Sequence, residues 1–228
     1  MLLKVASCVQ VLENYAKGLG SSMLEVVNFF ERSAGRWRSQ RTTHHLAFRR
    51  AEVGDSEISV FALAASDPAV QELCQFHEVD PQLAVCGSRV TWQGTMGWDR
   101  DSEGGHEGKT VFAIVPDQDN PLCGRLLRER GYAEIIPVVG RYHLDAEGGL
   151  NLTTEYETMS SIERFWFETP ELRLRTSTVK RFGGFSTASF CSEARLSANQ
   201  QEPSDDSCSP VAVEKTIQIS SPLSAFGW

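Results

Sequence analysis

The sequence predicts an all-β protein, a ten-stranded antiparallel barrel with a short N-terminal helix and one further helix. Ten runs of alternating or β-branched residues follow one another, and turn residues such as Gly, Pro, Asn and Asp separate them. Two stretches have helical spacing, and there is no strand–helix–strand alternation of the kind that builds a parallel sheet. Many short strands joined by tight turns indicate a barrel or a sandwich, and the order of the first elements, described below, favours the barrel.

Composition sets the bounds of this prediction. The chain has 228 residues, of which 41% are hydrophobic and 23% are charged, enough to bury one core. Residues 23–196 carry the alternating runs and are expected to form a single domain. Residues 1–22 are weakly patterned and are expected to be a poorly ordered leader. From residue 197 the composition changes to Ser, Gln, Asp and Pro, which predicts a disordered or loosely docked tail over 197–228, with one short alternating run at 211–219.

Charge and cysteine content exclude several classes of protein. The net charge of −8 argues against a nucleic-acid partner or an anionic membrane surface. No apolar run approaches the length of about 18 residues that a transmembrane helix needs, so no membrane insertion is expected. The six cysteines form no CxxC pair and have no metal-ligand spacing. We therefore expect reduced thiols, no bound metal and no tightly bound cofactor.

A short amphipathic helix is expected at the start of the domain. Ser22 has the character of an N-cap, apolar residues follow at helical spacing, and Glu25 occupies the capping-box position. Gly35 and Trp37 then open a strand that runs to Phe48. A Gly-x-Trp sequence just after a short helix, at the start of the first strand, is typical of lipocalin-like barrels, in which the tryptophan closes the barrel floor.

The remaining elements follow from turn signals and alternation. A second helix is expected over 68–77, with Asp67 as its N-cap and a proline in its first turn. Strands are expected at 56–63, 85–98, 109–115, 124–130, 137–144 and 149–156. Turns at 169–171 and 182–184 separate three further antiparallel strands between residues 160 and 195.

Two arginines share one face of the strand that begins at Leu172. The period of two places Arg173, Arg175 and Ser177 on one face, and Leu172 and Leu174 on the other. The two guanidinium groups are then about 7 Å apart, a spacing that suits an anion with two separated carboxylates better than one phosphate. The pattern leaves two interpretations open, a solvated outer face with the leucines in the core, or an inner wall that binds an anion.

Four longer segments carry a resemblance to a known family. They are SQRTTHHLAF (39–48), RERGYAEIIPVVGRYH (128–143), TEYETMSSIERFWF (154–167) and LRLRTSTVKRFGGFSTASFCSE (172–193). From about residue 23 to 196 the sequence resembles the S-type phycobiliprotein lyases, also called CpcS/CpeS-like bilin lyases. The resemblance implies a lipocalin-like or fatty-acid-binding-protein-like barrel that takes up a free phycobilin, a linear tetrapyrrole such as phycocyanobilin or phycoerythrobilin, as its substrate. It also implies transfer of the bilin to a cysteine of an apo phycobiliprotein α or β subunit, with a thioether formed at the ethylidene side chain of ring A.

The resemblance gives the arginines and the tryptophans roles in binding. Arg173 and Arg175 are expected to pair with the two propionates of the bilin, and Ser177 to donate a hydrogen bond to a propionate or lactam oxygen. Three tryptophans are expected to offer flat apolar surface to the tetrapyrrole, although core packing alone would also explain them: Trp92, Trp98 and Trp166.

Glu163 is the expected catalytic carboxylate. A carboxylate that hydrogen-bonds the pyrrole nitrogens favours the protonated, cationic bilin, whose ethylidene group is the better acceptor for a thiolate. The alternative is a surface acid on the strand, paired with Arg164 or another neighbour.

Two functions of other classes fit the same fold. One is a non-catalytic lipocalin-like carrier of a bilin, a fatty acid or another apolar anion, and the other is a structural barrel with a filled core that acts through its surface. The sequence leaves open which bilin and which subunit are used, and whether the active form is a homodimer or needs a related lyase chain. We expect the protein in the cytoplasm or plastid stroma, near phycobilisome assembly.

Overall fold

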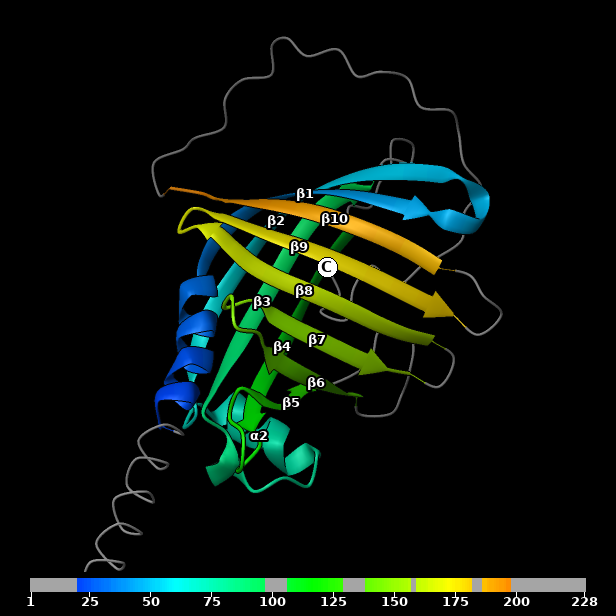
Figure 1. The fold of residues 1–228 in the computed structure, drawn as a ribbon. Coiled ribbons are helices and arrows are strands. Elements are labelled where there is room, and N and C mark those ends of the chain that lie inside the picture. The colour runs from blue at the N-terminus through cyan, green and yellow to red at the C-terminus, as the bar shows by residue number, and fades with distance from the viewer. Residues whose placement is uncertain (1–19, 97–105, 129–137, 157–158, 182–185, 198–228) are drawn as a thin grey trace, which may run out of the picture.

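The computed structural model describes residues 20–96, 106–128, 138–156, 159–181 and 186–197. In these residues ten antiparallel strands form a closed barrel, in which each strand pairs with its neighbours in sequence and β1 pairs with β10 (Figure 1). The strands are β1 (Gly35–His45), β2 (Arg50–Ala64), β3 (Cys86–Met96), β4 (His106–Pro116), β5 (Cys123–Arg128), β6 (Val138–Leu144), β7 (Leu150–Glu155), β8 (Met159–Thr169), β9 (Leu172–Arg181) and β10 (Ser186–Arg195). The helices are one over residues 20–33, α2 (Pro68–Phe76) and the 3-10 turns η1 (Leu46–Phe48) and η2 (Pro81–Leu83). The prediction of an all-β barrel is confirmed.

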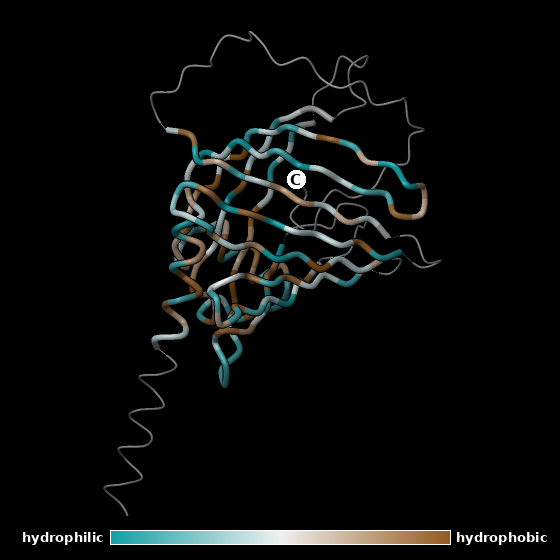
Figure 2. Tube along the Cα trace, turned by 45° about the horizontal axis from the view of Figure 1, so that its top comes forward, coloured by the Kyte–Doolittle hydropathy of each residue, from teal (hydrophilic) through white to brown (hydrophobic). Residues whose placement is uncertain are grey.

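The main core lies inside the barrel. Side chains alternate between the interior and the outer face, and hydrophobic and hydrophilic residues accordingly alternate along much of the strands (Figure 2). The interior cluster is made of apolar residues from the N-terminal helix and from most of the strands, among them Val26, Phe29, Trp37, Ile58, Val60, Phe112, Ile114, Leu126, Tyr142, Leu150, Leu152 and Phe165. This packing fixes which residues of each strand face inward.

Trp37 closes one end of the barrel. Its side chain is fully buried, and its Nε1 donates a hydrogen bond to the carbonyl of Ser33 at 2.9 Å. The guanidinium of Arg195 lies 4.1 Å from the centre of the indole ring and donates from Nη1 to the carbonyl of Ala34. Gly35 has φ of 129°, and a Cβ at this position would lie 2.6 Å from Nη1 of Arg195. The Gly-x-Trp sequence is therefore needed for this floor, as the sequence predicts.

The helix over residues 20–33 packs against the same end of the barrel (Figure 1). Its buried side chains, Val26, Phe29 and Phe30, belong to the interior cluster. The expected N-cap is wrong, because residues 20–22 are already helical and Ser22 lies within the helix. A serine is a preferred cap but is only mildly unfavourable inside a helix, so it does not fix where a helix begins.

Helix α2 covers part of the outer face. Asp67 accepts a hydrogen bond from the backbone N–H of Ala69 at 2.9 Å, which confirms the predicted N-cap. A second apolar cluster forms between this helix and strands β2, β4 and β5: Leu63, Val70, Leu73, Cys74, Val79, Ala84, Ala113, Val115 and Leu127. No helix among the described residues has the length and apolarity needed to cross a bilayer.

The first hairpin differs most from the prediction. Strand β1 ends at His45 rather than at Phe48, and β2 begins at Arg50 rather than at residue 56. Residues 50–55 have poor strand propensity, but they pair with residues 40–45 of β1 in unbroken register. Tertiary pairing therefore overrides local propensity here. The expected short run at 211–219 lies outside the described residues.

Candidate functional site

One part of the interior wall, formed by β8, β9, β10 and β1, carries charged side chains. Alternation places Glu163 on β8, Arg173 and Arg175 on β9, Glu193 on β10 and Arg41 on β1 inside the barrel. Their exposed fractions are 0% for both glutamates, 3% for Arg173, 1% for Arg175 and 8% for Arg41. Charged groups are rarely buried so completely unless they are paired or bind something. The arginines thus lie on the inner wall and the leucines of β9 on the outer face, while the binding of an anion by these arginines stays a prediction.

Strand register brings these residues into rows across the wall. Arg175 lies opposite Cys191, which in turn lies opposite Arg41. Arg173 lies opposite Glu193. Glu163 lies opposite Ser177, which is also buried. Residues directly opposite in antiparallel strands have side chains close enough to interact, so each row forms a contact set.

The two arginines of β9 lie beside the two buried glutamates: Arg173 pairs with Glu193, and Arg175 lies near both. Nε of Arg173 donates to Oε2 of Glu193 at 2.6 Å. Nη2 of Arg175 lies 3.6 Å from Oε1 of Glu193, and its Nη1 lies 3.9 Å from Oε1 of Glu163. Nη2 of Arg175 also donates to Sγ of Cys191 at 3.2 Å. The arginine pair is therefore pre-paired with protein carboxylates.

These pairings shift the ionisation of the groups. Burial opposes the charge on Glu193, but Arg173 and Arg175 outweigh it and hold the pKa of this carboxyl below its usual range. Burial likewise opposes the charge on Arg175, but Cys191, Glu193 and Glu163 raise its pKa. For Arg41, burial and the neighbouring Arg175 lower the pKa. The wall thus holds buried charges of both signs.

Aromatic rings support the two arginines of β9. The guanidinium carbon of Arg173 lies 4.9 Å from the ring centre of Trp37, and that of Arg175 lies 5.3 Å from the ring centre of Phe165. Stacking on these rings orients the planar guanidinium groups and adds cation–π attraction.

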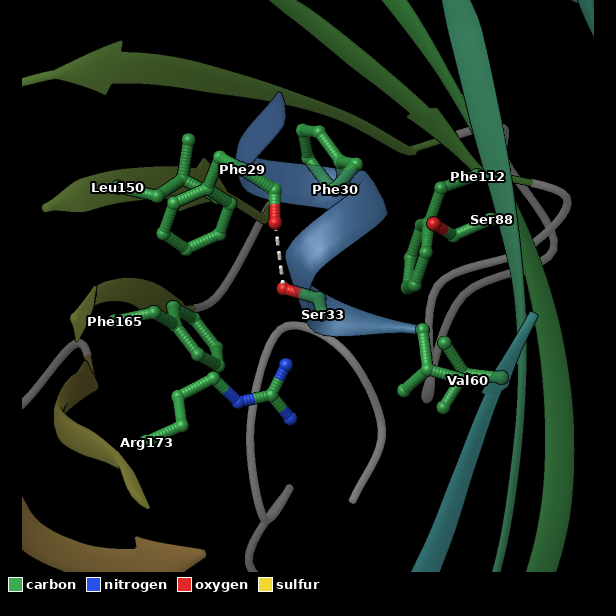
Figure 3. A pocket seen from close by; sticks show the side chains of 10 residues that line it. Phe29, Phe30, Ser33, Val60, Ser88, Phe112, Leu150, Phe165 and Arg173 are labelled. Carbon is green, nitrogen blue, oxygen red and sulfur yellow. Dashed lines mark hydrogen bonds between the residues drawn. The ribbon is translucent and has the colours of Figure 1, made fainter. Parts of the chain in front are cut away.

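A small cavity lies between the helix over residues 20–33 and the wall (Figure 3). Its volume is about 30 Å³, and Phe29, Ser33, Ser88, Phe112, Phe165 and Arg173 are among the residues that line it. In Figure 3 Arg173 and Phe165 lie on one side of the cavity, and Ser88 and Phe112 lie on the other. The cavity has the size of one or two water molecules, far below the several hundred Å³ of a site for a drug-sized ligand. A large ligand therefore cannot be held in this cavity alone.

The structure brings together four of the seven predicted site residues, which are Glu163, Arg173, Arg175 and Ser177. The interpretation of Glu163 as a surface acid paired with Arg164 is excluded, because Arg164 lies on the other face of β8 and pairs with Asp145 and Glu147.

The tryptophans are not part of this group. Trp92, on β3, is partly buried and packs against the interior cluster, with its ring over Gly108 of β4. Trp166 lies on the outer face of β8, with the guanidinium carbon of Arg164 at 5.1 Å from its ring centre, so we leave it out of the site. Trp98 lies outside the described residues.

Sequence reasoning missed Glu193 and the role of Arg41. Alternation along the last strand does place Cys191 and Glu193 on one face, and alternation along the first strand gives Arg41 the face of Trp37. That signal identifies a shared face, but it does not say which residue of another strand lies opposite.

The fold and this wall together define a lipocalin-like barrel with a charged, buried interior. The chain belongs to the CpeS-like protein family, whose family model matches residues 25–196.

Curated relatives and a solved structure agree with this membership. The chain is 60% identical over 205 residues to "Chromophore lyase CpcS/CpeS 2" of Trichodesmium erythraeum, a match that covers 90% of this chain and 100% of the relative. It is 56% identical to "Phycocyanobilin lyase subunit CpcS" of Picosynechococcus sp., over 91% of this chain and 99% of the relative. The structure of the S-type phycobiliprotein lyase CpeS from Guillardia theta matches with a TM-score of 0.67 and 34% identity, over 76% of this chain and 94% of that one.

Proposed function

We propose that this chain is a phycobiliprotein chromophore lyase, which binds a free bilin inside the barrel and attaches it to a cysteine of an apo phycobiliprotein subunit. One observation carries the proposal: a carboxylate, Glu163, and the arginines Arg173 and Arg175 are buried side by side on one interior wall. Such a wall fits a ligand that is cationic along its ring system and anionic at its propionates. The names of the relatives support the same reaction.

Arg173 retains capacity for a ligand carboxylate despite its ion pair with Glu193. Its Nε is used by Glu193, but within the described residues its Nη2 makes no hydrogen bond. An arginine guanidinium has five N–H donors, so it can hold a protein carboxylate and a propionate at the same time. Because the cavity beside Arg173 is small, the tetrapyrrole extends from this point toward the end of the barrel away from the N-terminal helix.

Glu163 acts on the charge of the bilin. A buried carboxylate beside the pyrrole nitrogens stabilises the protonated pigment, because charges interact more strongly in a site without water. The acceptor thiol then adds across the ethylidene double bond. The sulfur forms a bond to one carbon of this double bond. The thiol loses a proton, the other carbon gains one, and the reaction has no leaving group and no oxidation step. The lyase contributes position and charge, and the nucleophile comes from the acceptor subunit.

We further propose phycocyanobilin as the bilin, with phycoerythrobilin as the alternative, and an α or β phycobiliprotein subunit as the acceptor. One relative is named a phycocyanobilin lyase subunit, which favours both this pigment and a second lyase chain, identical or related, in the active form. We place the reaction in the cytoplasm or plastid stroma, near phycobilisome assembly.

Co-production tests the proposal. The chain is produced with a pathway that makes phycocyanobilin and with apo α or β subunits, and zinc-induced fluorescence is read on denaturing gels. A fluorescent subunit band that needs this chain is expected, with Arg175→Ala reducing it about tenfold or more, since one charge-assisted hydrogen bond contributes about 1.5–3 kcal/mol. Arg89→Ala, at an exposed position of β3, is the control. Pigment bound to the native chain with no fluorescent subunit band would indicate a carrier and contradict the lyase proposal.

A further inference from the structure

Arg128 is a buried arginine on the far side of the barrel from Glu163 and Glu193. It ends β5 and lies opposite Phe112 of β4. The preceding residues, Leu126 and Leu127, belong to the interior and the outer clusters respectively, so alternation turns Arg128 inward. Its exposed fraction is 6%. In barrel order β5 is three strands from β8 and five from β10.

This arginine has no anionic partner among the described residues. Its Nε and Nη1 make no hydrogen bond there, and no carboxylate lies within ion-pair distance of it. By contrast, Arg173 and Arg175 both lie beside glutamates. His77 contacts the backbone carbonyl of Arg128 at 2.7 Å, a contact that holds the strand end and does not involve the guanidinium. An isolated buried charge is strongly unfavourable, so an uncompensated arginine at this site indicates an external anion.

The balance of buried charges in the interior also indicates an anionic ligand. Among the described residues the buried charged side chains are Arg41, Arg128, Arg173, Arg175, Glu163 and Glu193. These are four positive groups against two negative ones, and Glu52 of β2, whose side chain is 15% exposed, partly offsets the charge of Arg41. The buried set is therefore positive on balance, which attracts the carboxylates of a ligand.

A second unsatisfied polar group lies in the same row. Phe112 lies opposite Arg128 on one side and opposite Ser88 of β3 on the other. Ser88 is 2% exposed, and its Oγ makes no hydrogen bond among the described residues. With strands about 4.8 Å apart, Ser88 and Arg128 are about 10 Å apart across the ring of Phe112. Figure 3 places Ser88 and Phe112 across the cavity from Arg173.

We infer that Arg128 binds one carboxylate of the bilin from the β5 side of the barrel, while Arg173 and Arg175 hold the other on the opposite wall. The ring system then lies across the interior, with the aromatic face of Phe112 beneath it and the Ser88 hydroxyl available to a polar edge. This inference rests on the proposed function and changes one expectation from the sequence, in which the arginine pair of β9 binds both propionates.

Bilin and its dimethyl ester provide the test. Dissociation constants are measured by absorption titration for phycocyanobilin and for phycocyanobilin dimethyl ester, in which both carboxylates are neutral. The ratio of ester to acid dissociation constants reports the attraction between the protein and the carboxylates. It is determined for the wild-type chain, for Arg128→Met, for Arg128→Lys, and for Arg125→Met, which removes an arginine from the other face of β5.

The ratio is expected to fall about tenfold in Arg128→Met, to fall less in Arg128→Lys, and to stay at the wild-type value in Arg125→Met. Without ligand, Arg128→Met is expected to unfold at the same or a higher urea concentration, because it removes an uncompensated buried charge. A wild-type ratio in Arg128→Met would show that Arg128 does not bind the carboxylate. A loss of unliganded stability in both Arg128 variants would show that the protein itself uses this charge. Either result would overturn the inference. Absence of bilin binding to the wild-type chain would instead reject the proposed function and the inference together.

Discussion

Arg173 and Glu193 form an ion pair inside the barrel, with Nε 2.6 Å from Oε2 and side chains that are 4% and 0% exposed. Both groups are taken out of water, so their mutual attraction and hydrogen bond must offset two desolvation penalties. The pair also joins β9 to β10, next to the strand pairing that closes the barrel. Loss of this ion pair is therefore expected to affect the stability of the barrel as well as ligand binding.

Glu193→Gln is expected to lower the free energy of unfolding by about 3 kcal/mol, because it leaves Arg173 buried without its carboxylate. Urea denaturation measures this change. The double variant Arg173→Met/Glu193→Leu, which removes both charges, is expected to recover most of the loss. Equal destabilisation in the single and double variants would show that packing, rather than charge, accounts for the effect.

Asp145 is expected to make the stability depend on pH in the acid range. It accepts hydrogen bonds from Nε of Arg164, the N–H of Gly149 and Nδ2 of Asn151, and these outweigh the effect of burial and lower its pKa from 3.8 to about 2. A carboxyl with a lowered folded-state pKa stabilises the fold above its unfolded pKa, and this contribution is lost as the pH falls.

The window for this loss runs from pH 3.8 down to about 2. Urea midpoints measured between pH 5 and 2 are expected to fall less steeply in Asp145→Asn than in the wild-type chain. Glu147→Gln is the control, since Glu147 contacts the same arginine from a side chain that is 82% exposed. Parallel pH profiles for the wild type and Asp145→Asn would contradict the assignment.

The sequence is sufficient to predict the barrel but not the composition of its wall. Alternation correctly groups Arg173, Arg175 and Ser177, whereas the side of the sheet that they face depends on how the barrel closes. Glu193 is beyond a sequence argument, because its pairing with Arg173 follows from strand register between residues 20 positions apart. The placement of Trp166 in the site could have been rejected from the sequence, because Trp166 is three residues from Glu163 and a period of two puts these residues on opposite faces.

Glu163→Gln keeps the shape of the side chain and removes its charge. We expect the bound bilin to shift its absorption toward that of the neutral pigment and transfer to become slower, because the carboxylate no longer stabilises the cation. Absorption spectra of the bound pigment and the rate of appearance of the fluorescent subunit measure both effects. An unchanged spectrum together with an unchanged rate would remove Glu163 from the mechanism.

Gly108 allows the ring of Trp92 to lie flat against β4. A Cβ at Gly108 would overlap the indole, so Gly108→Ala is expected to displace the ring and to destabilise the barrel by about 1–3 kcal/mol. If Trp92 contacts the pigment, affinity for bilin falls as well. Gly20→Ala, where a Cβ meets no atom within 4 Å, is the control. Retention of both stability and affinity in Gly108→Ala would show that the contact is not needed.

The last prediction is that no cysteine of this chain takes part in the transfer. A relay through a thioether on the lyase itself would need an accessible thiol of low pKa near the bilin. Cys74 lies on α2 and packs against the outer face of the barrel, and burial raises its pKa. Burial also raises the pKa of Cys86, to about 12. Neither thiol has the properties of a nucleophile.

Among the cysteines that the structure describes, Cys191 is the one that contacts the proposed site, through Arg175, and it is 1% exposed. Burial raises its pKa although Arg175 opposes the shift, and its sulfur accepts a hydrogen bond from that arginine. This contact indicates a structural role, in which the sulfur helps to orient the guanidinium. Cys191→Ser, which keeps an acceptor for Arg175, is therefore expected to retain binding better than Cys191→Ala.

A chain with alanine at Cys74 and serine at the other five cysteines is expected to transfer bilin at close to the wild-type rate. Denaturation of the wild-type complex in acid urea is expected to release all of the pigment, because the bilin is bound without a covalent bond to the lyase. The decisive measurement is pigment that remains on the lyase after denaturation. If such pigment were found, and if one cysteine substitution abolished both the retained pigment and the transfer, the reaction would pass through a lyase-bound thioether and the mechanism proposed here would be wrong.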